Sequence, residues 1–393
     1  MSARQAPCRG ACGTAWLTVP RILVAIGLCL FIAACDKVSR SVVIHPADEV
    51  PDRLSDWGVV SADGAYFKLN DDVIPYALNA PLFSDYALKL RSVWLPDGQS
   101  ARYNDTRELD FPIGTIISKT FHYEKAGSFS ATSPNVIAAD RESTLDEHRQ
   151  LKLDDYLLIE TRLLIRYEQG WKALPYVWNA AQDEAFLELA GEARKIRLVS
   201  DGDSQDIDYI VPDANQCGGC HMPNYSAREL RPLGPRAWQL NRNFNYADTT
   251  ENQLRHWAAE GLLTGLSEAP PQGVRWSQPA QATLEQRAKA YLDANCAHCH
   301  NPVGAADTSA LNLDIDAPID RRYGVCKTPV AVGRGSGGRP YDVSPGKPDE
   351  SILLYRMQHS DPAIAMPELG RSVVHVEGVK VISAWIAGMN GTC

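Results

Sequence analysis

The stretch Cys296-Ala297-His298-Cys299-His300 decides which fold we expect for this chain. In an exported protein the pattern C-x-x-C-H is typical of covalent haem attachment, because two thiols can add to the vinyl groups of a porphyrin and the adjacent imidazole can bind the iron. A second copy, Cys217-Gly218-Gly219-Cys220-His221, lies upstream. The sequence therefore predicts two covalently bound haem c groups, with His221 and His300 as iron ligands. A four-thiolate zinc site also fits two C-x-x-C pairs, but the histidine after each pair favours haem.

Candidates for the second axial ligand of each iron are few, because the chain has only five methionines. Met366 lies in the stretch 363–370, which lacks strong helical periodicity and is therefore expected to lie over the open face of the second haem. A thioether ligand there favours ferrous iron and raises the reduction potential. The first haem has no comparable candidate, since Met222 directly follows His221 and cannot reach the opposite face. His256 is the other candidate in that part of the chain, on the polar side of its expected helix.

The N-terminus indicates export. Arginines precede a short apolar run from Ile22 to Ala34, which is the layout of a secretory signal peptide over residues 1–34 and is too short to span a bilayer comfortably. The run ends at Cys35 in a string, Ile-Ala-Ala-Cys, that resembles a bacterial lipoprotein box, in which this cysteine would be lipidated. We therefore expect a protein of the bacterial periplasm, anchored to a membrane by lipid. An ordinary signal peptide followed by a chance cysteine is the alternative.

The charge and the cysteine content agree with export. The net charge of −9 becomes more negative when the arginines of the signal leave, so we expect no nucleic acid and a basic or neutral redox partner. Of the ten cysteines, only Cys326 and Cys393 lie outside the signal, the lipoprotein box and the two motifs. In an oxidising compartment we expect this pair to form a disulfide. Two unpaired buried thiols are the alternative.

Between a polar tether, residues 35–52, and the first motif, the sequence predicts strands. Residues 158–167 alternate apolar and polar side chains, as in a strand with one buried face. Residues 92–103 hold two apolar runs separated by Pro-Asp-Gly, as in a hairpin. No nucleophile motif, phosphate loop or clustered metal-ligand pattern stands out here. We expect a β-sandwich-like domain over residues 53–212, in which the isolated His122 is structural.

Beyond residue 212 the sequence predicts helices and loops. A capping-box pattern begins a short helix at Thr250, and apolar residues share one face of a helix that leads into the second motif. We therefore expect a first haem c module over residues 213–270 and a second cytochrome c domain over residues 271–393. The expected fold class is α+β multidomain, with an N-terminal β-sandwich-like domain followed by two mainly α-helical cytochrome c-type haem modules.

Several further strings accompany the two motifs. They are Gln239-Leu-Asn-Arg, Gly324-Val-Cys-Lys-Thr-Pro-Val, Pro345-Gly-Lys-Pro-Asp-Glu-Ser-Ile-Leu, Met366-Pro-Glu-Leu-Gly, Asp110-Phe-Pro-Ile-Gly-Thr, Lys119-Thr-Phe and Tyr176-Val-Trp-Asn. With the motifs, they resemble an uncharacterised family of exported bacterial di-haem c-type cytochromes with a β-rich N-terminal region. The resemblance covers nearly the whole mature chain. It implies haem binding and electron transfer, and it supplies no substrate.

Three functions are therefore open. The first is an electron carrier, in which two haems pass single electrons between periplasmic or membrane redox proteins. The second is a di-haem peroxidase-like enzyme with a reactive first haem. The third is a ligand-binding β-rich domain joined to an electron relay. We favour the carrier over the catalyst, and the spin state of the two irons separates these two.

Overall fold

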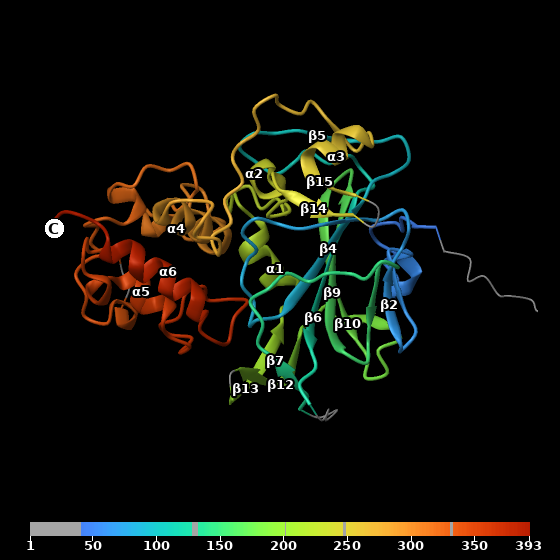
Figure 1. The fold of residues 1–393 in the computed structure, drawn as a ribbon, viewed down its shortest axis with the longest axis horizontal. Coiled ribbons are helices and arrows are strands. Elements are labelled where there is room, and N and C mark those ends of the chain that lie inside the picture. The colour runs from blue at the N-terminus through green and yellow to red at the C-terminus, as the bar shows by residue number, and fades with distance from the viewer. Residues whose placement is uncertain (1–40, 128–132, 201, 247–248, 331–332) are drawn as a thin grey trace, which may run out of the picture. The chain divides into compact units, whose positions relative to one another are not determined.

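A six-stranded antiparallel sheet lies at the centre of the computed structural model (Figure 1). The structure describes residues 41–127, 133–200, 202–246, 249–330 and 333–393. The predicted signal peptide and Cys35 therefore lie outside the described residues. The described residues form one compact unit. No helix in the described part of the chain is both long enough and apolar enough to cross a bilayer.

The order of strands in the central sheet is β11-β10-β9-β6-β4-β3. Its strands are β3 (Ile74–Tyr76), β4 (Leu88–Trp94), β6 (Ile116–Glu124), β9 (Tyr156–Tyr167), β10 (Gly170–Trp178) and β11 (Ala185–Leu187). One three-stranded sheet consists of β1 (Val60–Ala62), β2 (Tyr66–Leu69) and β8 (Gln150–Lys152). Another consists of β7 (Asn135–Ile137), β12 (Glu192–Ser200) and β13 (Asp203–Val211). The two remaining pairs are β14 (Asn243–Asn245) with β15 (Thr250–Asn252), and β5 (Ala101–Arg102) with β16 (Leu263–Thr264).

The helices of the described residues are short. The α-helices are α1 (Ala214–His221), α2 (Ala237–Leu240), α3 (Gln253–Ala259), α4 (Leu284–Leu292), α5 (Ile352–Met357) and α6 (Val376–Ala387). The π-helical turn η2 (Asp293–Ala297) continues α4 into the second motif. The 3-10 turns are η1 (Leu54–Trp57), η3 (Asp307–Ser309), η4 (Arg321–Tyr323), η5 (Gly333–Ser336) and η6 (Pro348–Glu350).

The predicted fold class is wrong, because the chain beyond residue 212 does not form two mainly α-helical haem modules. The longest α-helix described there, α6, has 12 residues, and strands β14 to β16 lie where a helical module was expected. Turns and irregular connections separate these elements. Proline and glycine explain the difference, since each of the stretches 232–235 and 269–273 contains both and so interrupts helix formation. The short helices are stabilised by packing against other elements, as α1 packs on β10.

Both faces of the central sheet are covered. Trp57 and Trp178 belong to a cluster of buried side chains on one face, whereas Phe121 and Ile159 belong to a cluster on the other. The register between β6 and β9 shifts between Phe121 and His122, which marks a β-bulge. Ile159 therefore does not lie on the same face as the later apolar residues of β9, as strict alternation had predicted. The polar face of β9 is also buried, since Glu160 is 0% exposed.

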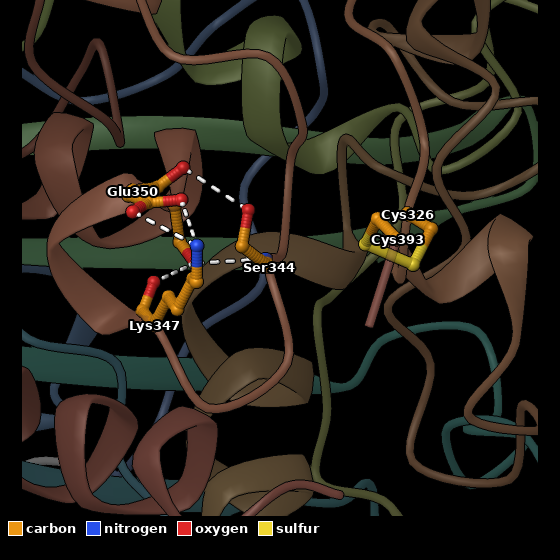
Figure 2. The surroundings of a disulfide bond; sticks show 6 residues. Cys326, Ser344, Lys347, Glu350 and Cys393 are labelled. Atoms are coloured by element: carbon orange, nitrogen blue, oxygen red, sulfur yellow. Dashed lines mark hydrogen bonds and ion pairs between the residues drawn. A yellow bond between two sulfur atoms is a disulfide. The ribbon is translucent and has the colours of Figure 1, made fainter. Parts of the chain in front are cut away.

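A disulfide joins Cys326 to Cys393, which are 67 residues apart in the sequence (Figure 2). Closing a loop of that length stabilises the fold by roughly 4 kcal/mol in the chain-entropy model. Figure 2 also shows the turn near this disulfide, in which Lys347 Nζ pairs with a Glu350 carboxylate oxygen at 2.9 Å and Ser344 Oγ donates to the Glu350 carbonyl. The disulfide thus ties the C-terminus to the segment that follows η4.

His122 lies inside the sheet on β6 and is 0% exposed. Its Nε2 lies 2.9 Å from Ser143 Oγ. Burial lowers the pKa of this imidazole from 6.5 to about 3, because the charged form would lose its hydration. The side chain is therefore neutral in the folded protein at neutral pH, as expected for a structural histidine.

We predict that His122→Gln removes part of the acid sensitivity of folding. Below pH 6.5 the unfolded chain protonates this imidazole, whereas the folded chain does so only near pH 3, so stability falls with pH by about 1.4 kcal/mol per unit in that window. The difference in unfolding free energy between wild type and variant should therefore shrink from pH 7 to pH 4 in urea titrations. The exposed His148→Gln serves as the control. A constant difference between wild type and His122→Gln would contradict this account.

Candidate functional site

Helix α1 carries the first motif and is fixed at its N-terminus. The Asp213 side chain accepts hydrogen bonds from the backbone N–H groups of Asn215 and Gln216, both at 2.8 Å, and Gln216 Oε1 accepts from the Asp213 N–H. This capping box satisfies N–H groups that the first turn leaves free. One turn later, the helix holds Cys217 and Cys220 on the cavity described below.

The two motifs lie against each other. Cys299 Sγ donates to the carbonyl of Gly219 at 3.4 Å, and the Cys220 thiol contacts the side chains of Cys299 and His298. This contact with Cys299 lowers the pKa of Cys220, because the Cys299 S–H can donate to the Cys220 thiolate in place of the Gly219 carbonyl. The fold therefore brings together two motifs that are far apart in the sequence.

A cavity of about 460 Å³ lies beside the first motif. The first motif contributes Cys217, Cys220 and His221 to its wall, and the second contributes Ala297 and His298. Most of the remaining wall is apolar and includes Leu163, Leu164, Pro232, Leu233 and Leu369. This volume lies in the range of sites that enclose a small organic molecule or cofactor.

The sheet side of the cavity carries positive charge. Arg91, Lys119 and Arg162 lie in register across β4, β6 and β9, and all three line the cavity. Arg162 is neutralised by Glu160, with Nε–Oε2 and Nη2–Oε1 distances of 2.7 and 2.5 Å. Among the described residues, neither Arg91 nor Lys119 forms an ion pair. Burial, reinforced by the two neighbouring arginines, lowers the pKa of Lys119 to about 7. The wall therefore favours a ligand that is apolar over most of its surface and carries negative groups.

Both motif histidines are held with one ring nitrogen free to bind a metal. His221 Nδ1 donates to the Arg231 carbonyl at 2.8 Å. His300 Nδ1 donates to Ser309 Oγ at 3.0 Å, because the Ser309 hydroxyl is already donated to a carbonyl. Burial lowers the pKa of each imidazole to about 4. Both rings are therefore neutral at pH 7 with Nε2 as the lone-pair nitrogen, which is the form that binds metals.

The second motif and Met366 meet at a much smaller space. Cys296 and Met366 line one cavity of about 20 Å³. That volume holds about one water molecule and not a porphyrin, so the side chains around it must separate before a haem can bind there. Arg371 holds the Met366 segment, because its guanidinium donates to the carbonyls of Met366, Arg356 and His359 at distances from 2.8 to 3.1 Å. The structure thus brings Cys296 and Met366 to one cavity that has no space for a haem, and His300 does not line that cavity.

The weaker candidates for the first iron lie elsewhere. His256 Nδ1 pairs with Glu251 at 2.7 Å, and its ring stacks on Tyr246 at a centroid distance of 3.7 Å. His256 is not among the residues that line the cavity. The Met222 side chain lies over Gly218 on its own helix, since a Cβ at that glycine would lie 2.9 Å from Met222 Cε. Neither side chain is placed opposite His221.

Sequence reasoning missed the basic residues of the cavity and the role of Arg371. One signal was present for Lys119, which interrupts an apolar strand and belongs to the string Lys119-Thr-Phe. No comparable signal marks Arg91 or Arg371, because their positions depend on strand register and on a loop conformation.

The donor set of the first motif fits a haem better than a zinc ion. Two thiols, a neutral imidazole and a cavity of adequate volume lie together. Within the described ranges, the one group of three or more side chains able to share a metal ion is Asp140, His375 and Glu377. The four motif cysteines thus do not gather around one point, as a four-thiolate zinc site requires.

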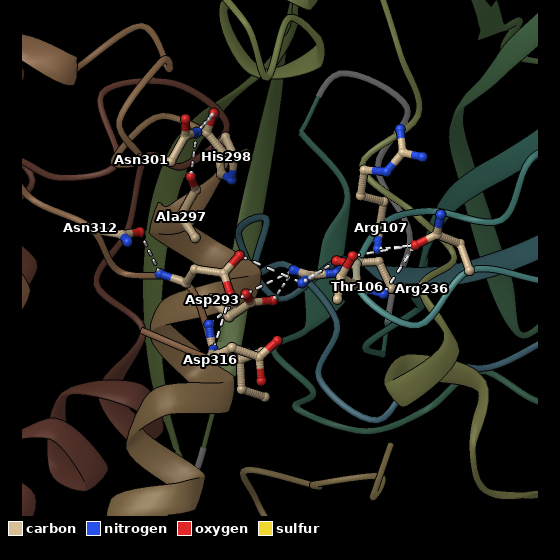
Figure 3. A network of polar contacts seen from close by, with 12 residues as sticks. Thr106, Arg107, Arg236, Asp293, Ala297, His298, Asn301, Asn312 and Asp316 are labelled. Carbon is tan, nitrogen blue, oxygen red and sulfur yellow. Dashed lines mark hydrogen bonds and ion pairs between the residues drawn. The ribbon is translucent and has the colours of Figure 1, made fainter. Parts of the chain in front are cut away.

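A buried ion pair links the segments that carry the two motifs (Figure 3). Arg236 Nη1 donates to Asp293 Oδ1 at 2.9 Å, and Arg236 Nη2 donates to the Thr106 carbonyl at 2.9 Å. Asp293 Oδ1 also accepts from the Ile315 N–H at 3.0 Å. Asp293 begins the π-helical turn that contains Cys296. This pair therefore fixes the second motif to the chain that follows the first.

Comparisons with protein-family models, with curated proteins and with solved structures gave no match. The resemblance to exported di-haem cytochromes therefore stays a prediction from the sequence. The function must be argued from the geometry of the two motifs and of the cavity beside them.

We predict that Arg236→Met destabilises the protein by about 3–5 kcal/mol, because it leaves the buried Asp293 carboxylate without its partner. The double variant Arg236→Met/Asp293→Leu should recover most of this loss, since it leaves no buried charge unpaired. The other acidic partner of Arg236, Asp314, is partly exposed and stays hydrated. Chemical denaturation of the wild type, both single variants and the double variant measures the coupling. A loss below about 1 kcal/mol, or a double variant as unstable as Arg236→Met, would show that the pair does not hold the motifs together.

Proposed function

We propose that the chain is a di-haem c-type cytochrome that transfers single electrons between redox partners. The observation that carries the proposal is the contact between the two C-x-x-C-H motifs, in which Cys299 Sγ lies 3.4 Å from the Gly219 carbonyl oxygen. The thiols of Cys220 and Cys299, which would each hold a different haem, are neighbours. Electrons pass faster between redox groups that are close together. Two haems that worked independently would not need adjacent motifs, whereas electron transfer between two haems does.

The cavity supports haem at the first motif in three respects. Cys217 and Cys220 would hold the porphyrin, and His221 would bind its iron through Nε2. The apolar walls suit a porphyrin ring, and Arg91 and Lys119 would balance its two carboxylates. Bound there, haem supplies one-electron oxidation and reduction of its iron. At the second motif the support is the donor set alone, with Cys296 and Met366 on one small cavity.

The proposal includes a place for the protein in the cell. A signal peptide over residues 1–34 and lipid on Cys35 would place the protein on the periplasmic side of a bacterial membrane. The acidic chain would meet a basic or neutral redox protein in the periplasm or in that membrane. In this arrangement the anchor raises the rate of encounter with partners by keeping both on one surface.

One observation favours the peroxidase-like alternative. Met366, Met357 and Met222 do not line the large cavity, whereas Lys119 and Tyr76 do. An iron at the first motif without a thioether opposite His221 would leave a position open to a small oxidant. The coordination of the first iron therefore decides between carrier and catalyst.

Electron paramagnetic resonance and cyanide binding on the matured, oxidised protein test the proposal. A carrier should show two low-spin irons that bind cyanide slowly, because both axial positions are filled by the protein. A high-spin fraction that binds cyanide or peroxide rapidly would support the peroxidase-like enzyme and contradict the carrier.

A paired variant separates the two irons. Arg371→Gln should release the Met366 segment and convert one low-spin signal to high spin, because the loop loses hydrogen bonds to several carbonyls. The exposed Arg334→Gln serves as the matched control and should leave both signals unchanged. If Arg371→Gln has no effect on either signal, the hydrogen bonds from Arg371 do not hold an iron ligand in place.

A further inference from the structure

Three side chains with metal-binding atoms converge at the start of α6, away from the C-x-x-C-H histidines. His375 precedes this helix, Glu377 lies in its first turn, and Asp140 comes from the connection after β7. His375 Nε2 lies 3.6 Å from Asp140 Oδ2 and 3.7 Å from Glu377 Oε2. All three ligand atoms lie within 4.8 Å of one another.

The imidazole nitrogen at the centre of this group lacks a hydrogen-bond partner. His375 is 5% exposed, and its Nε2 is buried without a hydrogen bond. Distances of 3.6 and 3.7 Å are too long for hydrogen bonds to the two carboxylates. A buried polar atom left in this state costs free energy, and native structures rarely leave one without a ligand or a partner. A shared cation would satisfy the nitrogen and both carboxylates together.

The surroundings hold these ligands in place. His375 Nδ1 lies 3.0 Å from the Tyr291 hydroxyl, and the imidazole stacks on the Phe83 ring at a centroid distance of 4.1 Å. Glu377 Oε2 accepts from the Tyr86 hydroxyl at 2.8 Å. A histidine that binds a metal usually has its second ring nitrogen fixed in this way, and the fixing partner orients the ring.

The turn that places the Tyr86 hydroxyl has a strained backbone conformation. Asp85 and Tyr86 have φ angles of +47° and +59°, a region that residues other than glycine rarely adopt. The turn is held because Asp85 Oδ1 accepts from the N–H groups of Ser372 and Val373 at 2.6 and 3.0 Å. The same hydrogen bonds fix the segment that delivers His375. Strain of this kind persists only where surrounding contacts maintain it.

We propose that Asp140, His375 and Glu377 bind one divalent transition-metal ion, with Zn²⁺ as the best match. Bonds of about 2.0–2.2 Å to one zinc ion place its ligand atoms roughly 3.0–3.6 Å apart, close to the distances found here. An imidazole with two carboxylates suits zinc better than magnesium or calcium, which prefer oxygen ligands alone. The two carboxylates balance the charge of the ion. The Asp140 side chain is 30% exposed and gives the ion a route from solvent.

The metal would link the β-rich part of the chain to the C-terminal helix. Asp140 follows strand β7, whereas His375 and Glu377 begin α6. His375 also lines the small cavity that it shares with Cys296 and Met366. A bound ion would therefore fix one wall of that cavity. This inference does not depend on the proposed electron transfer.

Zinc binding by the full-length, matured protein tests the proposal. After treatment with a chelator and incubation with Zn²⁺, the wild type should retain one zinc ion per chain by elemental mass spectrometry. Asp140→Asn and Glu377→Gln remove surface carboxylates without disturbing the core, and each should weaken binding at least tenfold in isothermal titration. Tyr291→Phe retains the ring and removes only the hydroxyl, and should weaken binding about tenfold.

Controls separate this site from other zinc ligands. His148→Gln and Asp97→Asn change exposed residues outside the cluster and should bind zinc as the wild type does. Zinc-edge X-ray absorption should show nitrogen and oxygen neighbours and no sulfur. The proposal is overturned if the wild type retains no zinc, if Asp140→Asn and Glu377→Gln bind it unchanged, or if sulfur neighbours show that motif cysteines hold the ion.

Discussion

The buried contact between Arg236 and Asp293 is the constraint on which the candidate site depends. Arg236 belongs to the segment after the first motif, and Asp293 begins the turn that carries Cys296. Since burial penalises both charges, each group is stable inside the protein only while the other is present. The pair therefore keeps together two motifs that are separated in the sequence by helices α2, α3 and α4. Arg236 and Asp293 also line the cavity beside the motifs, so the pair holds part of its wall.

A second constraint comes from the sheet. β9 turns Glu160 and Arg162 inward, and its neighbours add Lys119 and Arg91 to the same face. Glu160 neutralises Arg162, whereas Arg91 stays charged and Lys119, with its pKa lowered to about 7, is partly protonated, so the folded chain carries buried positive charge beside an apolar cavity. Such an arrangement costs free energy in the protein alone and is relieved by a ligand with negative groups. The β-rich part is therefore one wall of the site as well as a platform for it.

The sequence predicts local features better than the shape of the molecule. The spacing of Cys217, Cys220 and His221 predicts haem attachment without knowledge of the fold, because one helical turn sets their relation, and this chemistry stays a prediction. The disulfide between Cys326 and Cys393 is also predicted correctly, because these are the two cysteines outside the signal, the lipoprotein box and the motifs. Short apolar stripes, however, do not tell how long a helix continues, and proline and glycine end these helices early.

Contacts between distant parts of the chain could not be predicted from the sequence, for a different reason. The bulge opposite Phe121 and His122 changes which face Ile159 occupies, and alternation along a single strand does not reveal a bulge. The cluster at His375 joins Asp140 of the β-rich part to two residues at the start of α6, so no spacing in the sequence marks it. Local periodicity contains no information about which strands become neighbours, and these sites depend on that choice.

The most direct measurement is the intact mass of the chain produced together with the machinery that attaches haem to exported proteins. Our account predicts a mass that includes two tetrapyrroles and no free thiol in either C-x-x-C-H motif. A mass without any added tetrapyrrole, with all four motif cysteines free to react, would contradict it.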